Sequence, residues 1–137
     1  MPTGVCAWRG GLAVADAWNH RVLIWHDVPT RSGQPADLVL GQLSGCAVLA
    51  NRGRDHPDAA SLHWPYGVAE ISGRLVVCDS GNRRVLVWND PTATGQPADL
   101  VLGQRSFDCR DENAGVRFRR FQCAGRTARH GGAVIWP

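Results

Sequence analysis

Apolar positions along this chain fall in short runs that clusters of turn residues separate. From residue 67 onward the runs are 67–71, 74–79, 84–89 and 98–104, and they are rich in Val, Leu and Trp. Ser, Gly, Asn, Pro and Thr fill the separators, which is typical of strands joined by tight turns. Separators this short permit only antiparallel pairing, because a parallel crossover needs about a dozen residues. The pattern predicts a four-stranded antiparallel meander.

The same set of runs occurs twice. The ten residues GQPADLVLGQ stand at 33–42 and again, unchanged, at 95–104. Upstream, LAVADAWNHRVLIW at 12–25 matches LVVCDSGNRRVLVW at 75–88 at eight of fourteen positions. Helical periodicity is absent from both copies. A tandem repeat of this length indicates two copies of one structural unit, so we predict an all-β fold of two four-stranded units.

A polar set marks the turn between the second and third run of each copy. The pattern V-x-D-x-x-N-x-R-V supplies Asp16, Asn19 and Arg21 in the first copy and Asp79, Asn82 and Arg84 in the second. Short Asx side chains accept hydrogen bonds from turn N–H groups, and the Arg lies within reach of an acid across the turn or on the next unit. Because the set recurs in each copy, whereas a catalytic site is expected once, we interpret it as structural.

One family pattern accounts for the second copy. The residues that carry it are Pro65, Gly67, Val68, Asp79, Gly81, Asn82, Arg84, Val85 and Trp88. This pattern resembles the NHL repeat, whose units form the blades of β-propellers that usually have six blades. The resemblance implies two four-stranded antiparallel blades of a partial propeller, at 2–42 and 65–104. A long connection, 43–64, joins them, and 105–137 is a basic connection or tail.

The tail ends as a further unit would begin, because Trp136-Pro137 matches Trp64-Pro65. We therefore expect that the chain is a fragment of a larger NHL-repeat protein. All 15 cationic residues are Arg, which we interpret as the coding bias of a G+C-rich, bacterial genome. It stays open whether the residues after about 115 are native sequence or out of frame.

Two kinds of residue depart from the repeat. Trp18 replaces the turn glycine aligned with Gly81, and a bulky residue resists positive φ, so we expect a turn of different shape in the first copy. Trp8 and Trp18 have no counterpart in the other copy and are candidates for a recognition surface. The histidines show no metal-ligand spacing, and His20 and His26 are expected to be exposed turn residues.

The net charge of +3 is concentrated in the tail, which contains seven Arg and only three acidic residues. The stretch VRFRRFQ interleaves Arg117, Arg119 and Arg120 with Phe, which suits contacts to an anion or to RNA. Nucleic acid is thus a less favoured partner, and RNA binding through this tail is the second alternative function.

Catalytic signatures are absent from the two copies. The five cysteines form no C-x-x-C pair and are interpreted as reduced thiols, and Glu70 is the sole carboxylate on the two innermost strands. We expect no cofactor and no metal. The resemblance also implies a first alternative, a fragment of a propeller enzyme of the metal-dependent lyase or lactonase type, whose ligands lie on missing blades.

The favoured function is a non-catalytic binding or scaffold segment that recognises a protein or peptide, because loops on rigid blades collect recognition residues. No apolar run approaches the ~20 residues that span a bilayer, so we expect no membrane association. No signal peptide is visible, which slightly favours the cytoplasm, but a missing N-terminus would remove such a signal.

Two blades cannot close a propeller and leave an apolar face open at each end. Two outcomes are open for the isolated chain. It aggregates, which we favour, or three copies associate head to tail and complete a six-bladed ring.

Overall fold

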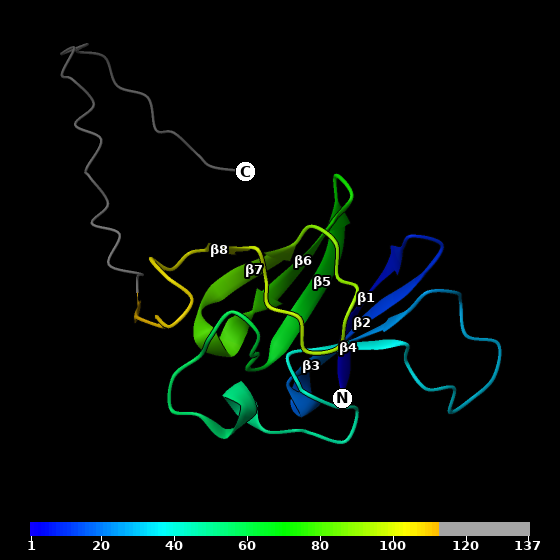
Figure 1. Cartoon of the computed structure of the whole chain (residues 1–137), viewed down its shortest axis with the longest axis horizontal. Coiled ribbons are helices and arrows are strands. Elements are labelled where there is room, and N and C mark those ends of the chain that lie inside the picture. The colour runs from blue at the N-terminus through cyan, green and yellow to red at the C-terminus, as the bar shows by residue number, and fades with distance from the viewer. Residues whose placement is uncertain (113–137) are drawn as a thin grey trace, which may run out of the picture.

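Two four-stranded antiparallel sheets make up the part of the chain that the computed structural model describes, residues 1–112 (Figure 1). In each sheet the strands follow one another in sequence order. Blade 1 consists of β1 (Pro2–Trp8), β2 (Gly11–Asp16), β3 (Arg21–Trp25) and β4 (Leu38–Leu40). Blade 2 consists of β5 (Pro65–Ile71), β6 (Arg74–Asp79), β7 (Arg84–Trp88) and β8 (Leu100–Leu102). The predicted all-β fold of two four-stranded antiparallel blades is confirmed.

The turns between the second and third strands of the two blades have the same shape. Each is a single 3₁₀ turn, η1 (Ala17–Asn19) in blade 1 and η3 (Ser80–Asn82) in blade 2. The positive φ falls on the residue after the turn, His20 or Arg83, and both residues have φ 54° and ψ 44°. The expectation of a different shape is therefore wrong, because the residue at the Trp18 position does not need positive φ.

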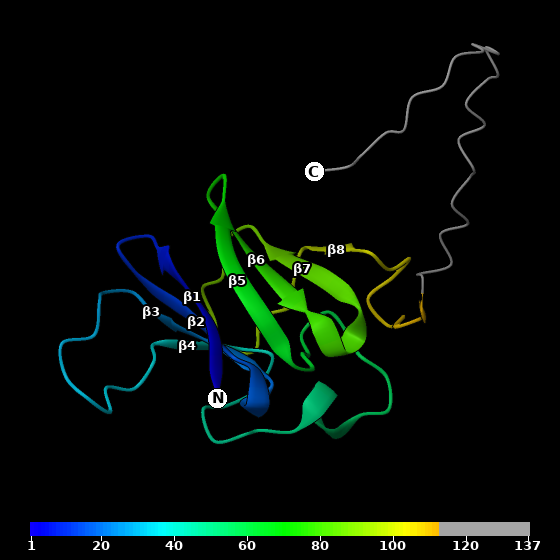
Figure 2. The ribbon, with the colours of Figure 1, turned by 180° about the vertical axis from the view of Figure 1, so that it is seen from behind.

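The blades pack face to face around one apolar core, with β5 beside β1 and β2 (Figures 1 and 2). Blade 1 contributes Ala13, Val22, Ile24, Leu38 and Leu40, and blade 2 contributes Leu75, Val77, Leu86 and Trp88. Trp8 joins this core with 2% of its surface exposed, so its candidacy for a recognition surface is wrong. Trp18, in contrast, is 63% exposed.

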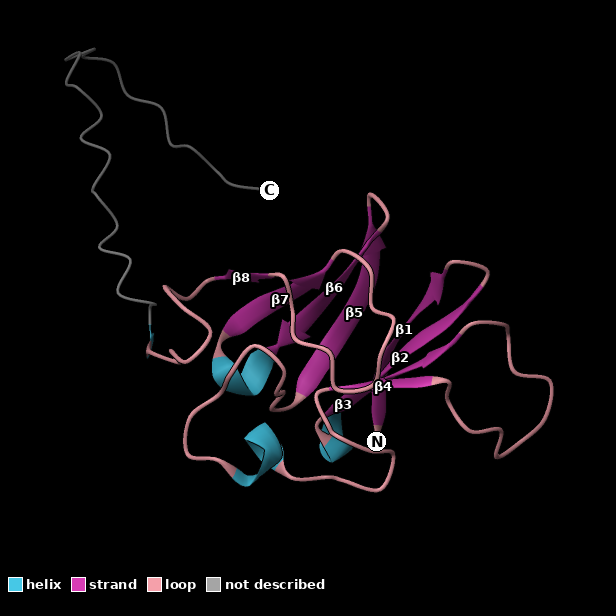
Figure 3. Cartoon of the chain, viewed as in Figure 1, coloured by secondary structure: helices cyan, strands magenta, loops and turns pink. Residues whose placement is uncertain are grey.

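The connection 43–64 runs along the lower edge of both blades and contains η2 (Ala50–Gly53) (Figure 3). It returns toward blade 1 at its end, where Ser61 forms a parallel bridge with Gly41. Leu62 is fully buried between the blades. The connection is therefore packed against the blades. Within residues 1–112, no helix is long and apolar enough to cross a bilayer.

Candidate interaction surface

Asp79, Asn82 and Arg84 form one hydrogen-bonded cluster at the turn between β6 and β7. The strand register places Asp79 opposite Arg84. The Oδ2 atom of Asp79 accepts from Asn82 Nδ2 at 2.8 Å and from Arg84 Nε at 2.7 Å, and this ion pair is fully buried. Burial raises the pKa of the Asp79 carboxyl, because its removal from water outweighs the Arg84 charge and the hydrogen bonds.

The same cluster fixes the connection to blade 2. Arg84 Nη2 donates to the carbonyl oxygens of Asp58 and Ser61, both at 2.9 Å. The other oxygen of Asp79, Oδ1, accepts from the backbone N–H of His63 at 2.7 Å. Side chains of the repeat motif thus satisfy backbone groups of the connection that burial would otherwise leave unpaired.

A second anchor joins the connection to the cluster through a pair of amides. Asn51 Nδ2 donates to Asn82 Oδ1 at 3.0 Å, and Asn82 Nδ2 donates to Asn51 Oδ1 at 2.8 Å. Both side chains are buried, and the backbone of Asn51 has a positive φ of 49°. Asn is one of the few residues that adopt this conformation readily. Asn therefore fits this position for two reasons: it tolerates the positive φ, and its amide both donates to and accepts from Asn82.

Gln42, the last residue of blade 1, holds the beginning of the connection. Its Nε2 donates to the carbonyl oxygens of His20 at 3.1 Å and Leu49 at 2.8 Å, and the residue is 1% exposed. Gln104 takes the same place after blade 2, where its Nε2 donates to the carbonyl oxygen of Arg83 at 3.1 Å.

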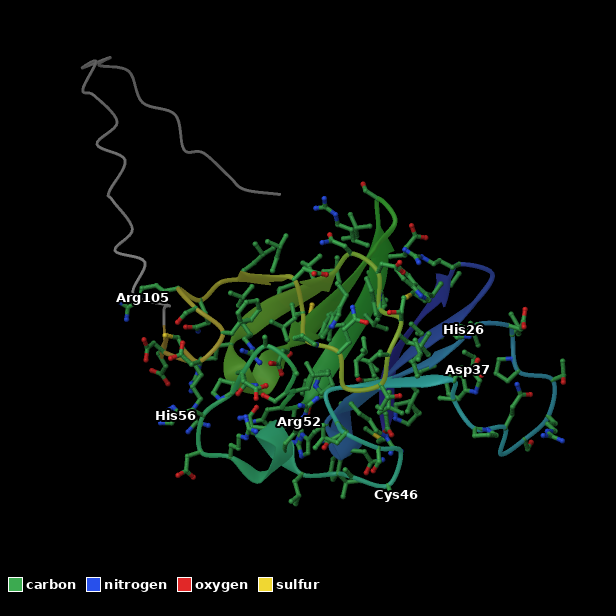
Figure 4. The ribbon with its side chains drawn as sticks, viewed as in Figure 1. His26, Asp37, Cys46, Arg52, His56 and Arg105 are labelled. Atoms are coloured by element: carbon green, nitrogen blue, oxygen red, sulfur yellow. The ribbon has the colours of Figure 1, made fainter. Side chains whose placement is uncertain are left out.

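An apolar pocket of about 300 Å³ opens on the connection that these contacts hold. It is lined by Gln42, Leu43, Cys46, Ala47, Val48, Leu49 and Arg52. Leu43 is 72% exposed, Leu49 63% and Val48 45%. Three large apolar side chains are thus exposed together on one loop, and contiguous apolar patches of this kind are typical of interaction sites. Figure 4 shows Cys46 and Arg52 on this lower side of the molecule.

Arg52 supplies a positive charge at the edge of the pocket. Its Nε donates to the Gly41 carbonyl at 3.4 Å and its Nη2 to the Gly95 carbonyl at 3.1 Å. Burial lowers the pKa of Arg52, but a guanidinium stays charged at neutral pH. Within residues 1–112, Nη1 has no hydrogen-bond partner. The pocket therefore combines an apolar wall with a fixed donor that suits a carbonyl or carboxylate.

Asp16, Asn19 and Arg21 form the equivalent cluster in blade 1. Asp16 Oδ2 accepts from Asn19 Nδ2 at 2.9 Å and from Arg21 Nε at 2.8 Å. Arg21 Nη1 also donates to the carbonyl of Gly45. Partial burial works to raise the pKa of Asp16, but the hydrogen bonds from Asn19 and Arg21 and the Arg21 charge together hold it below its ordinary value. The structure thus brings together each set of three residues that the repeat motif singled out.

His20 is a half-buried residue at the junction of the blades. Its Nδ1 accepts from the backbone N–H of Trp64 at 3.0 Å, and its ring contacts the His63 ring at 5.2 Å between centroids. Burial, together with the neighbouring His63, lowers the pKa of His20. The expectation of an exposed turn histidine is therefore wrong for His20. His26 is exposed and lies 3.7 Å from the carboxylate of Asp37, both labelled in Figure 4.

The remaining candidates for chemistry do not converge in the described part of the chain. Glu70 accepts a hydrogen bond from the N–H of Gly73, within its own hairpin. No three His, Cys, Asp or Glu side chains within residues 1–112 are grouped so that they could hold a metal ion. The candidate anion or RNA contacts at Arg117, Arg119 and Arg120 lie outside the described residues.

Sequence reasoning missed two anchors of this surface, Asn51 and Gln42. A signal for Gln42 was present, because Gln104 repeats it at the end of the ten-residue identity. Asn51 has no such signal, since the connection between the blades shows no second copy to compare.

Comparison with known proteins adds one family. The family model for the NHL repeat matches residues 1–25, which include β1 to β3 and the first Asp-Asn-Arg cluster. A comparison with curated proteins finds no match, and neither does a comparison with solved structures.

Proposed function

Because residues 1–25 match the NHL repeat, we propose that the chain serves as a non-catalytic scaffold that binds a protein or peptide partner through the pocket on its connection. The NHL repeat is typical of β-propeller interaction scaffolds. The observation that carries the proposal is the pocket itself, an apolar surface exposed on a loop that is held from several sides.

The pocket suits one chemistry of partner. Its volume of about 300 Å³ accommodates a large apolar side chain, and Leu43, Val48 and Leu49 form the apolar wall. Arg52 at the edge can donate to a backbone carbonyl or an acidic side chain next to that apolar residue. The partner is therefore an extended peptide segment with an apolar anchor, in the manner of an interface centred on one buried side chain.

Rigidity of the loop supports binding. The anchors at Gln42, Asn51 and Arg52 fix the loop before a partner arrives. A loop that is already ordered loses less conformational entropy on association, so a small contact area suffices for specific binding.

A random peptide library displayed on phage tests the proposal. We expect enriched peptides that carry a large apolar residue, and we expect Leu49→Asp to weaken their binding at least tenfold. Val28→Asp, a control at a residue that is 57% exposed on the β3–β4 loop, should leave binding unchanged. Failure to enrich any peptide, or equal binding by Leu49→Asp, would overturn the proposal.

A further inference from the structure

The outward face of blade 1 repeats the face that blade 2 buries. Blade 2 packs on blade 1 with Leu75, Val77, Leu86, Trp88 and Val101. The repeat aligns these with Leu12, Val14, Leu23, Trp25 and Val39, and the residue type is identical at all five positions. Four of the blade 2 residues are fully buried, whereas Leu12, Val14, Leu23 and Trp25 are only partly buried.

The outward face of blade 2 likewise repeats the face that blade 1 buries. Blade 1 contributes Ala13, Ala15, Val22, Ile24, Leu38 and Leu40 to the inner side. The aligned residues on blade 2 are Val76, Cys78, Val85, Val87, Leu100 and Leu102, all of them apolar. Leu100 is 45% exposed and Leu102 55%, and both line a shallow apolar hollow.

The outer strand of each blade shows the same correspondence in its hydrogen-bonding groups. Thr94 Oγ1 accepts from the Val39 N–H on β4 at 3.2 Å, and the Gly95 N–H donates to the Val39 carbonyl at 2.8 Å. The loop of blade 1 offers the same pair, Ser32 and Gly33, with φ of 73° at Gly33 against 75° at Gly95. The edge residue of blade 2 that corresponds to Val39 is Val101, which has no such partner within residues 1–112.

The Asp16-Asn19-Arg21 cluster of blade 1 makes fewer hydrogen bonds than the equivalent cluster of blade 2. Arg84 Nη2 binds two carbonyls of the connection, but Arg21 Nη2 binds none within residues 1–112. Asp79 Oδ1 accepts a backbone N–H at 2.7 Å, whereas Asp16 Oδ1 has only the N-terminal amine, at 3.4 Å. At blade 2 the equivalent groups bind residues 58–63, the segment of the chain that precedes β5.

From these four correspondences we infer that the chain associates head to tail with a second copy of itself. Blade 1 of one copy packs on the outward face of blade 2 of the next copy, in the way that blade 2 packs on blade 1 within the chain. The loop with Ser32 and Gly33 then pairs with the β8 edge at Val101.

One contact of the internal interface has no counterpart in the association. Arg9 of blade 1 forms an ion pair with Asp90 of blade 2, but Ser72 takes the Arg9 position in blade 2. Both partners of this pair are exposed, so its absence matters little. The contact is heterologous, because it joins two different faces. An open assembly therefore keeps one uncovered blade 1 face at one end and one uncovered blade 2 face at the other, until a ring closes.

Two charged substitutions test this geometry by light scattering after size exclusion. Leu23→Arg blocks the outward face of blade 1, and Leu102→Arg blocks that of blade 2. We expect the unsubstituted chain to have a mass that rises with concentration to a multiple of 14.9 kDa, and each variant alone to be a monomer. An equimolar mixture should form a dimer of twice the chain mass, because each variant keeps the face that the other lacks.

Leu49→Asp, which lies in the peptide pocket, should leave association unchanged, so that failure of association and failure of peptide binding are told apart. An unsubstituted chain that stays monomeric at all concentrations would overturn the inference, with no substitution needed. A mixture that remains monomeric, from variants whose circular dichroism shows folded β-structure, would overturn it as well.

Discussion

Arg84 and Arg21 occupy the same place in the repeat, but their surroundings differ. Arg84 is fully buried and donates to the Asp79 carboxylate and to three backbone carbonyls. Arg21 is 15% exposed at its side chain and donates to Asp16 and to the carbonyl of Gly45. The difference arises because residues 58–63 of the connection cover the cluster of blade 2, whereas no segment within residues 1–112 takes that place at the cluster of blade 1.

We predict that Arg84→Ala lowers the free energy of unfolding by about 3–5 kcal/mol, because it leaves the Asp79 carboxylate buried without its cation. Arg21→Ala should cost about 1–2 kcal/mol, since Asp16 keeps Asn19 and gains water. Urea unfolding at low protein concentration measures both values. Equal losses in the two variants would contradict the difference in burial.

At the scale of the element, the connection determines which residue the turn before the third strand can hold. A Cβ atom on Gly81 would lie 2.5 Å from the His63 carbonyl oxygen, so that the turn of blade 2 has no room for a side chain there. Trp18 fills the same position in blade 1, where its side chain is 63% exposed. The glycine is therefore required by the close approach of the connection.

Gly81→Ala should accordingly lower the free energy of unfolding by about 2 kcal/mol, a cost typical of overpacking. Trp18→Ala, the matched change in blade 1, should alter it by less than about 0.5 kcal/mol, as exposed positions usually do. Thermal or urea unfolding compares the two. A neutral Gly81→Ala would mean that the connection does not press on this turn.

Most of the strands could be predicted from the sequence, because alternation and turn residues act locally. The predicted run 74–79 coincides with β6, whereas the predicted 98–104 shrinks to β8, Leu100–Leu102. At the start of that run Asp99 does not continue the strand; its carboxylate instead accepts from the Asn89 N–H. The two Asp-Asn-Arg sets could be found because they repeat.

The pocket could not be predicted, because its walls come from the connection. Nothing in the residues 43–49 identifies which apolar side chains stay exposed, since that depends on where Asn51 and Gln42 hold the loop. The positive φ at Asn51 and at Arg52 changes the direction of the chain within η2. No local sequence pattern predicts this change of direction.

On the scale of the whole molecule, the two blades share one core. The outward face of each blade carries apolar residues at the positions that the other blade uses to form this core. Within residues 1–112 nothing covers these two apolar faces fully, and a second copy of the chain can cover either of them. Aggregation of the isolated chain, expected from the sequence, and ordered head-to-tail association are thus two results of the same exposed surface. Aggregation leaves the β8 edge at Val101 without a defined partner, whereas head-to-tail association pairs this edge with the loop at Ser32 and Gly33 of another copy.

Amide hydrogen exchange at Val101, compared with Val39 in the same molecule, distinguishes these states directly. The Val39 N–H is bonded to Thr94 within the chain, so it should exchange slowly at every protein concentration. Head-to-tail association predicts that Val101 exchanges fast in dilute solution and becomes as slow as Val39 when concentration rises. Fast exchange at Val101 at all concentrations, with Val39 protected throughout, would contradict the equivalence of the internal and external interfaces.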